Sequence, residues 1–173
     1  MEKVLFVITD LCTGCNRCAY VCSAMHEGMF IPSKARIHIN NFPFEGFSAP
    51  SICFQCPEPE CVEACPVEAL VKNDDGVVLV DEEICTGCGE CVEACPYGMM
   101  EMNENDIAFK CDYCGGDPAC VKVCYSHALV FREPEGELER LRELQMQERS
   151  ESGSPEEKRH QLGINLLAEI RKK

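Results

Sequence analysis

Sixteen of the 173 residues are cysteines, and they fall into four groups of four with none left over. We call these groups tetrads one to four; they are Cys12, Cys15, Cys18 and Cys22; Cys53, Cys56, Cys61 and Cys65; Cys85, Cys88, Cys91 and Cys95; and Cys111, Cys114, Cys120 and Cys124. Thiolates are soft ligands for iron and zinc, and a short loop can turn several of them toward one centre. The cysteine pattern therefore predicts metal binding.

The spacing within the tetrads favours iron–sulfur clusters over zinc. Tetrads one and three read C-x2-C-x2-C-x3-C, the spacing of bacterial ferredoxins, and Pro96 follows Cys95 as it does there. Tetrads two and four keep this order with a longer middle gap, and Pro66 follows tetrad two. Glycines such as Gly14 and Gly87 allow the positive φ that a tight metal-binding loop needs. Zinc sites usually combine two separated C-x2-C pairs, so zinc is the weaker interpretation.

In loops of this type the first three cysteines surround one [4Fe–4S] cluster, and the fourth ligates the neighbouring cluster of a pair. Four complete tetrads thus predict four [4Fe–4S] clusters. Residues 69–81 lie between tetrads two and three, and there two β-rich runs flank the turn Asn73-Asp74-Asp75-Gly76. A hairpin at this place would join tetrads two and three into one two-cluster ferredoxin, and tetrads one and four would pair around it.

This nested pairing predicts four ligand groups, which we call sets A to D. Set A is Cys12, Cys15 and Cys18 with Cys124; set B is Cys111, Cys114 and Cys120 with Cys22; set C is Cys53, Cys56 and Cys61 with Cys95; and set D is Cys85, Cys88 and Cys91 with Cys65. The alternative pairs tetrad one with two and tetrad three with four, although only 15 residues separate Cys95 from Cys111. Sequence reasoning favours the nested pairing and leaves the alternative open.

The expected fold class is α+β, with nested two-cluster ferredoxin folds built from short β-hairpins and helices, followed by a helical tail. The expected domains are a four-cluster domain over 1–134 and a tail over 135–173. Within the first, an inner ferredoxin covers about 51–105, and 1–50 with 106–134 form the outer pair. Alternating residues predict strands at 4–8 and 35–39, and two prolines with three phenylalanines predict a shielding loop over 40–50.

The tail has no cysteine and no aromatic residue, and its leucines recur at helical spacing. Leu138, Leu141 and Leu144 mark a first helix over 137–149. A second begins at Ser154-Pro155-Glu156-Glu157, a capping box with proline at the first helical position. We weigh two interpretations equally: these helices fold onto the core, or they form an arm for docking or oligomerisation.

The formal charge is −14, from 30 acidic and 16 basic residues. This excess argues against nucleic acid and anionic membranes as partners, because both need a basic face, and it suits a cationic docking partner. The apolar run at 4–8 is too short for a signal peptide, and no run of about 18 apolar residues predicts a membrane span or direct membrane insertion. We therefore expect a cytoplasmic location, where thiols stay reduced.

The chain shows no catalytic motif: no Walker loop, no G-x-G-x-x-G, no H-E-x-x-H and no nucleophile elbow. Every tetrad is complete, so no open iron site is indicated. We expect no catalytic residue and no active site on this chain. His26, four residues after Cys22, is interpreted as a solvated loop histidine, with a hydrogen bond to a cluster sulfur as the alternative.

The chain resembles the four-cluster electron-transfer subunits of molybdenum and tungsten oxidoreductases. The resemblance covers about 1–132 and rests on the tetrad order, on Lys110-Cys111-Asp112-Tyr113-Cys114 and on Ala119-Cys120-Val121-Lys122-Val123-Cys124. It implies the nested pairing and a relay of electrons between a pterin-cofactor catalytic subunit and an acceptor such as a flavin or ferredoxin. One departure is Tyr125-Ser126 after Cys124, where the family usually has proline.

Within this family the segments Cys22–Gly28 and Pro32–Ile37 look most like the small iron–sulfur subunits of tungsten aldehyde:ferredoxin oxidoreductases and class II benzoyl-CoA reductases, which are anaerobic enzymes. We prefer that branch. The alternatives are a beta subunit of the dimethyl sulfoxide reductase or formate dehydrogenase type, a free polyferredoxin, and a structural protein that uses metal only for folding.

Overall fold

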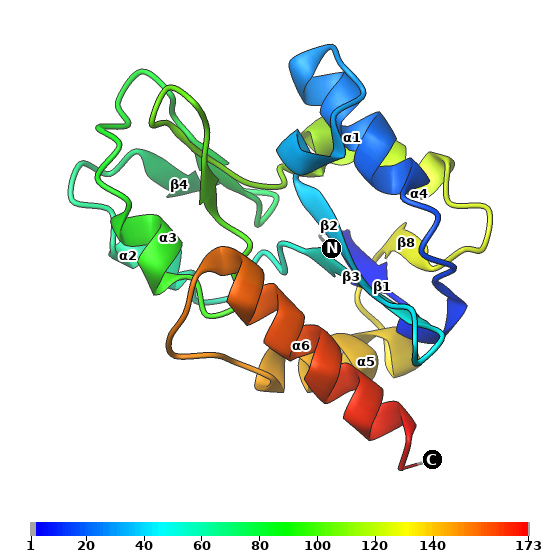
Figure 1. Ribbon diagram of the computed structural model, residues 1–173. Coiled ribbons are helices and arrows are strands. Elements are labelled where there is room, and N and C mark those ends of the chain that lie inside the picture. The colour runs from blue at the N-terminus through cyan, green and yellow to red at the C-terminus, as the bar shows by residue number, and fades with distance from the viewer. Residues whose placement is uncertain (1–2, 173) are drawn as a thin grey trace.

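The computed structural model describes residues 3–172 and consists of two lobes with a pair of helices across both (Figure 1). Its strands form four separate two-stranded antiparallel sheets. Helices and strands are short because the chain turns back at every tetrad. This mixture agrees with the α+β class expected from the sequence.

The outer lobe combines both ends of the cysteine-bearing region. Its elements are β1 (Val4–Val7), η1 (Thr9–Leu11), α1 (Arg17–Glu27), η2 (Pro32–Lys34), β2 (Ile37–Phe42), β3 (Phe47–Ile52), η3 (Tyr113–Gly116), α4 (Ala119–Lys122) and β8 (Leu129–Arg132). Strand β1 pairs with β8, with Val4 opposite Arg132, and α1 packs against α4. The strand predicted at 4–8 is thus confirmed, and its partner comes from the far end of the lobe.

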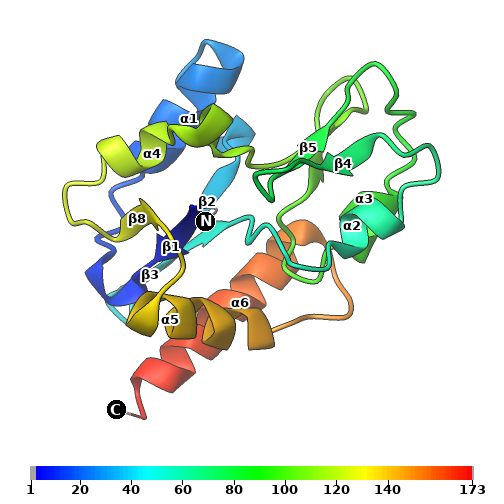
Figure 2. The same cartoon turned by 180° about the vertical axis from the view of Figure 1, so that it is seen from behind.

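The inner lobe repeats one small unit twice. Its elements are α2 (Glu60–Glu63), β4 (Leu70–Lys72), β5 (Val78–Val80), α3 (Glu90–Ala94), β6 (Glu101–Met102) and β7 (Ala108–Phe109). The hairpin predicted over 69–81 is confirmed as β4 and β5, with Leu70 opposite Val80. Helices α2 and α3 pack together on one side of this lobe (Figure 2).

The loop predicted over 40–50 is wrong. This stretch belongs to a hairpin in which β2 reaches Phe42 and β3 begins at Phe47, so only 43–46 form the turn. Pro50 lies opposite Ile39 without breaking the ladder, because both strands of a two-stranded sheet are edges and an edge tolerates a missing N–H. Phe42 and Phe47 pack across the hairpin, with their ring centroids 5.8 Å apart, whereas Phe44 in the turn is exposed.

The tail forms α5 (Gly136–Gln147) and α6 (Pro155–Ile170), close to the two helices predicted. The capping box is present: Ser154 Oγ accepts from the Glu157 N–H, and the Glu157 carboxylate accepts from the Ser154 N–H. Both helices lie against the core, α5 on β1 and α6 on β2 and β3 (Figures 1 and 2).

Arg159 on α6 connects the tail to both lobes. Its guanidinium donates to the Gly98 carbonyl at 2.5 Å and pairs with Glu101 of β6 at 2.7 Å, while its own carbonyl accepts from Asn40 of β2 at 3.0 Å. Burial opposes ionisation of Glu101, but hydrogen bonds from His38 and Arg159 hold the pKa of its carboxyl below the usual value. One tail residue therefore joins inner and outer hairpins.

The apolar cores are small and contain cysteines as full members. The outer core surrounds Leu5, Ile37 and Tyr113 and includes Cys18, Cys22, Cys111 and Cys120. The inner core surrounds Leu70, Val78 and Met100 and includes Cys91. A third core, where Leu162 of α6 meets Phe54 and Tyr97, joins the tail to the inner lobe. Sulfur occupies the positions that aliphatic side chains fill in other proteins.

We predict that Ser154→Ala loosens α6 without affecting the lobes. Losing a capping side chain costs about 1 kcal/mol, which corresponds to about fivefold faster hydrogen exchange of the α6 amides. Exchange followed by mass spectrometry on the anaerobically purified chain measures this, with Ser152→Ala in the exposed preceding loop as the control. Equal α6 exchange in both variants would contradict the role given to the cap.

Candidate metal centres

Each tetrad lies on a loop that enters a short helix. Cys18 and Cys22 lie on α1, whereas Cys61, Cys91 and Cys120 lie on α2, α3 and α4. Within residues 3–172, which include all sixteen cysteines, every thiol is free. The chain therefore presents sulfur ligands and no disulfide in the region that the structure describes.

One left-handed residue shapes the first C-x2-C of every tetrad. The residues are Gly14, Gln55, Gly87 and Tyr113, with φ between 49° and 73°. A Cβ on Gly14 would meet Ser48 Oγ at 2.5 Å, and one on Gly87 would meet the Asp106 carbonyl at 2.5 Å, so these two positions require glycine. Sequence reasoning recognised both glycines but missed the other two positions.

Buried contacts hold Gln55 and Tyr113 in this strained conformation. The Gln55 amide donates to the Cys111 carbonyl at 2.8 Å, and its oxygen accepts from the Val78 N–H at 2.9 Å. Tyr113 packs edge-on against Phe131 at 5.2 Å, and its hydroxyl accepts from the Leu5 N–H. These partners are distant in the sequence, so no local signal marks the two residues.

The structure brings the thiols of set A together. Burial raises the pKa of Cys18 to about 12, and the nearby thiols of Cys12, Cys15 and Cys124 raise it further. Burial also raises the pKa of Cys12, again with Cys15 and Cys124 adding to it. Three cysteines of tetrad one thus lie beside the last cysteine of tetrad four.

Set B shows the reciprocal arrangement. Burial raises the pKa of the Cys120 thiol, and the thiols of Cys22 and Cys114 raise it further. Burial also raises the pKa of Cys22, where Cys114 is again a neighbour. Burial raises the pKa of the Cys111 thiol well above the usual value, and the thiols of Cys53 and Cys120 raise it further.

Set C encloses a cavity. Cys53, Cys56, Cys61 and Cys95 all line it, together with the ammonium-bearing side chain of Lys110. Burial raises the pKa of both Cys56 and Cys61 to about 12, with the thiols of Cys53 and Cys95 adding to each.

Set D lies in the same lobe as set C. Burial raises the pKa of Cys91 to about 11, and its neighbours Cys85, Cys88 and Cys65 raise it further. Four all-sulfur groups of four fit the ligand requirement of [4Fe–4S] clusters. A buried group of neutral thiols ionises when iron supplies the compensating positive charge, which is why metal binding releases protons.

Backbone N–H groups point at the cysteines that end the tetrads. The amides of Arg36, Ala69 and Met99 donate to the Sγ atoms of Cys22, Cys65 and Cys95 at 3.2, 3.3 and 3.3 Å. Such bonds orient a ligand and stabilise the negative charge of its thiolate.

The turn after Cys124 keeps the shape found after Cys65 and Cys95, although it lacks their proline. The third residue after each cysteine is left-handed, with φ 56° at Glu68, 66° at Gly98 and 56° at His127. Each of these residues donates its N–H to the carbonyl of the cysteine that opens the turn. Tyr125-Ser126 therefore changes the sequence of this turn and leaves its backbone intact.

The sets follow one another in space. The Cys18 thiol of set A raises the pKa of Cys120 in set B, and the Cys53 thiol of set C raises that of Cys111 in set B. Cysteines of sets C and D pack around the same inner core: Cys61, Cys95, Cys65, Cys85 and Cys91. Of the sixteen cysteines, all within the described residues, Cys15 and Cys88 are exposed, and the others are buried or half-buried. The exposed thiols belong to sets A and D, at the two ends of the order A–B–C–D.

His26 lies on α1 beside set B, so its interpretation as a solvated loop residue is wrong. Its Nε2 is 3.7 Å from Cys114 Sγ and 3.6 Å from the Asp112 carboxylate, and 13% of its side chain is exposed. Burial and the nearby Arg36 guanidinium lower the pKa of His26. The ring is placed there by α1 itself, because His26 follows Cys22 by four residues, about one helical turn, and therefore lies on the same face of the helix.

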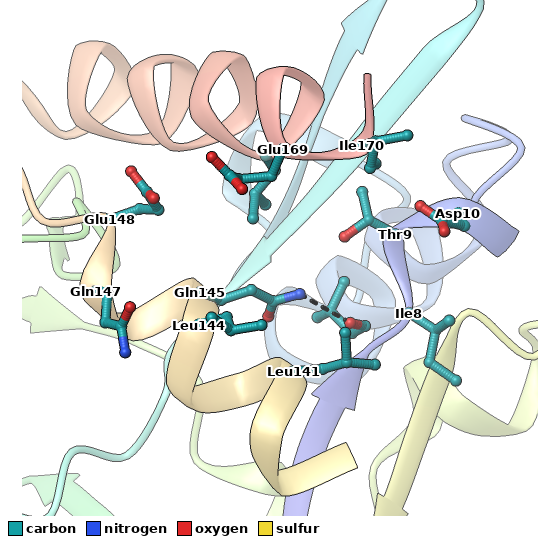
Figure 3. Close-up of a pocket in the computed structure, with 12 residues that line it drawn as sticks. Ile8, Thr9, Asp10, Leu141, Leu144, Gln145, Gln147, Glu148, Glu169 and Ile170 are labelled. Atoms are coloured by element: carbon teal, nitrogen blue, oxygen red, sulfur yellow. Dashed lines mark hydrogen bonds between the residues drawn. The ribbon is translucent and has the colours of Figure 1, made fainter. Parts of the chain in front are cut away.

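A separate cavity of about 310 Å³ lies between α5, α6 and the chain from β1 to η1 (Figure 3). Leu141, Leu144 and Ile170 give it apolar walls, and no cysteine lines it. Gln145 crosses it to donate to the Val7 carbonyl at 3.0 Å, so the tail is hydrogen-bonded to β1 here. This cavity has no ligand set for a metal.

Comparisons with known proteins identify iron–sulfur domains in this chain. The family of the 4Fe-4S dicluster domain matches residues 44–134, and a 4Fe-4S binding domain matches residues 9–25. The polyferredoxin-like subunit of aliphatic sulfonate oxidoreductase from Pyrococcus furiosus is 41% identical over 128 residues, which cover 72% of this chain and 73% of that protein.

Two further relatives are named as subunits of reductases. The thiosulfate reductase electron transfer subunit PhsB of Salmonella typhi is 33% identical, covering 83% of this chain and 84% of that protein. The probable anaerobic dimethyl sulfoxide reductase chain YnfG of Escherichia coli is 32% identical, covering 80% and 75%. The structure titled active site complex BamBC of benzoyl coenzyme A reductase, in complex with benzoyl-CoA, aligns with a TM-score of 0.46 at 23% identity, over 99% of this chain and 97% of that one.

Between residues 3 and 172, no helix combines the length and the apolar character needed to cross a membrane. The matched relatives are electron-transfer subunits of oxidoreductases rather than catalytic subunits, and the sixteen cysteines fit four [4Fe–4S] clusters. The chain belongs to the 4Fe-4S dicluster-domain family, as a ferredoxin-like electron-transfer subunit of an oxidoreductase.

Proposed function

We propose that this chain relays single electrons through four [4Fe–4S] clusters between a larger tungsten or molybdenum pterin subunit and a redox partner, a flavoprotein or a ferredoxin. The observation that carries the proposal is the order of sets A to D, with exposed thiols at the two end sets. A linear series with exposed thiols at its two end sets and none in its two middle sets suits transfer from one partner to another. A cytoplasmic and anaerobic setting is part of the proposal.

In this proposal each of sets A to D holds one cluster, with three ligands from one tetrad and one from another. A [4Fe–4S] cluster, once bound, supplies a one-electron carrier. The chain provides the thiolates, donates backbone N–H groups to Cys22, Cys65 and Cys95, buries three of the four cysteines of set B and half-buries those of set C. Low water access and donated N–H groups are the means by which a protein adjusts such a centre.

The two end sets have different surroundings, with exposed apolar and aromatic side chains at set A and acidic residues at set D. This difference supports two different partners. Leu11 and Tyr125 flank the cysteines of set A in the chain and are 44% and 56% exposed. Set D follows Asp81-Glu82-Glu83 and Ile84, and Ile84 is 47% exposed. We assign set D to a partner with a basic face, because opposite charges steer association.

The division into a four-cluster domain over 1–134 and a tail over 135–173 belongs to the same proposal. The tail packs on the core and keeps two exposed apolar side chains, Leu144 at 47%, which also lines the cavity between α5 and α6, and Ile164 at 40%. We propose that the tail contributes to docking or oligomerisation in the complex.

A second candidate for the partner is a molybdenum enzyme of the dimethyl sulfoxide reductase type. The similarity to PhsB and YnfG, whose names refer to thiosulfate and dimethyl sulfoxide reductases, favours it. The resemblance of Cys22–Gly28 and Pro32–Ile37 to subunits of tungsten enzymes favours the first candidate. A free polyferredoxin remains the alternative without a fixed partner.

Metal analysis of the complex that copurifies anaerobically with this chain separates these candidates. We expect about 16 iron atoms per chain, from four clusters of four, and tungsten in a larger partner. Molybdenum in its place would select the dimethyl sulfoxide reductase type, and iron without any partner would select the free polyferredoxin. Zinc, or iron without a reducible electron paramagnetic resonance signal, would contradict the relay itself.

The ligand sets are tested by single serine substitutions. We expect Cys95→Ser and Cys56→Ser to alter the same component of the electron paramagnetic resonance spectrum, because both residues belong to set C. Cys91→Ser, which belongs to set D but to the same tetrad as Cys95, is the matched control and should alter a different component. If Cys95→Ser and Cys91→Ser change the same component, tetrad three holds its own cluster and the nested pairing is refuted.

A further inference from the structure

Four basic side chains converge on the loops that carry set C. Lys72 donates to the Cys56 and Pro57 carbonyls at 3.0 and 2.9 Å. Lys110, which lines the set C cavity, donates to the Cys111 carbonyl at 2.8 Å and to Gln55 Oε1 at 3.0 Å.

The other two come from the tail. Arg142 of α5 donates to the Phe54 carbonyl at 2.7 Å, directly after Cys53. Lys158 of α6 donates to the Glu93 and Cys95 carbonyls at 2.9 and 3.0 Å. Residues of 135–173 thus bring two positive charges to a set whose cysteines all lie in the inner lobe.

None of these four cations has a carboxylate partner in the part of the chain that the structure describes. Every ion pair within 4.0 Å among residues 3–172 involves other basic side chains. Lys110 and Lys158 are each only 4% exposed, and Nε of Arg142 is buried without a protein acceptor. Burying unpaired positive charge is unfavourable unless a negative group lies near.

The other sets have fewer unpaired cations. Set B shares Lys110, which donates to the Cys111 carbonyl, but the guanidinium of Arg36 at set B is paired with Asp112 at 3.0 Å, so its charge is largely balanced. At sets A and D, the main influences on the pKa of Cys18 and Cys91 after burial are other thiols and backbone groups. At set C, Arg142 lowers the pKa of Cys56 and Lys110 lowers that of Cys61, both against the effect of burial.

We propose that Lys72, Lys110, Arg142 and Lys158 supply the counter-charge of the set C cluster and make it easier to reduce than its burial alone would allow. In the one-electron reduction, an external low-potential donor such as a reduced viologen loses one electron and set C gains one negative charge. Fixed positive charges nearby stabilise that product. The tail therefore has an electrostatic role in addition to packing. This inference rests on the proposed relay function.

Potentiometric titration followed by electron paramagnetic resonance tests the inference on the full chain. We expect Arg142→Gln to make one of the four components about tenfold harder to reduce, which is about 59 mV for a one-electron couple. Cys56→Ser identifies that component as set C. Lys158→Gln and Lys72→Gln should shift the same component in the same direction, and Arg142→Lys, which keeps the charge, should restore the wild-type value.

The matched control is Arg140→Gln, because Arg140 lies on the same helix, is 71% exposed and pairs with Glu137. It should leave all four potentials unchanged. Unchanged potentials in Arg142→Gln, Lys158→Gln and Lys72→Gln at full iron content would overturn the inference. So would an equal shift of all components, or an Arg142→Lys variant that behaves like Arg142→Gln. A wild-type chain without reducible iron would instead refute the relay, so the two failures are distinguishable.

Discussion

The thiol of Cys124 lies among those of Cys12, Cys15 and Cys18, and this contact brings the two ends of the cysteine-bearing region together. The β1–β8 ladder beside it spans only four residue pairs, and an isolated two-stranded ladder of that length is marginal in water. The apolar cores are correspondingly small and contain sulfur atoms as packing elements. The fold thus depends on bringing together four sulfurs of which one belongs to a cysteine distant in sequence. The strands and helices serve mainly to orient these cysteines.

Local sequence signals are sufficient to predict an element where one short segment determines its structure. The Asn73–Gly76 turn places β4 against β5, and the Ser154 capping box starts α6 where the sequence indicates. The cysteine spacing likewise marks every ligand-bearing loop. The prediction of a loop over 40–50 is wrong because prolines and phenylalanines also occur in edge strands, and here Phe42 packs on Phe47 and on His160 of α6. Contacts of this kind join distant segments, and single-sequence patterns contain no information on them.

Backbone geometry shows a similar division between local and distant causes. Gly14 and Gly87 can be read from the sequence as left-handed positions, but Gln55 and Tyr113 adopt the same conformation only because buried partners hold them. The turn after Cys124 lacks the proline of the equivalent turns but is still left-handed at His127. The N–H of His127 bonds to the Cys124 carbonyl and holds this conformation. Different residues therefore produce one loop shape at four places, through different combinations of local preference and tertiary contact.

Charge distribution is the least predictable part of the site, and also the part that distinguishes one set from another. The net charge of −14 indicates an acidic surface but says nothing about where the few basic residues lie. In the structure Lys110 and Lys158 are buried beside set C, held only by carbonyl and amide oxygens. Neutral acceptors orient such a cation without cancelling its charge, so its field reaches the neighbouring sulfurs. Set B shares Lys110 through the Cys111 carbonyl, but its own cation, Arg36, is paired with Asp112, and this ion pair limits the reach of the Arg36 charge. Sets with the same four ligands can therefore have different electrostatic surroundings, because a tail that contributes no ligand still contributes charge.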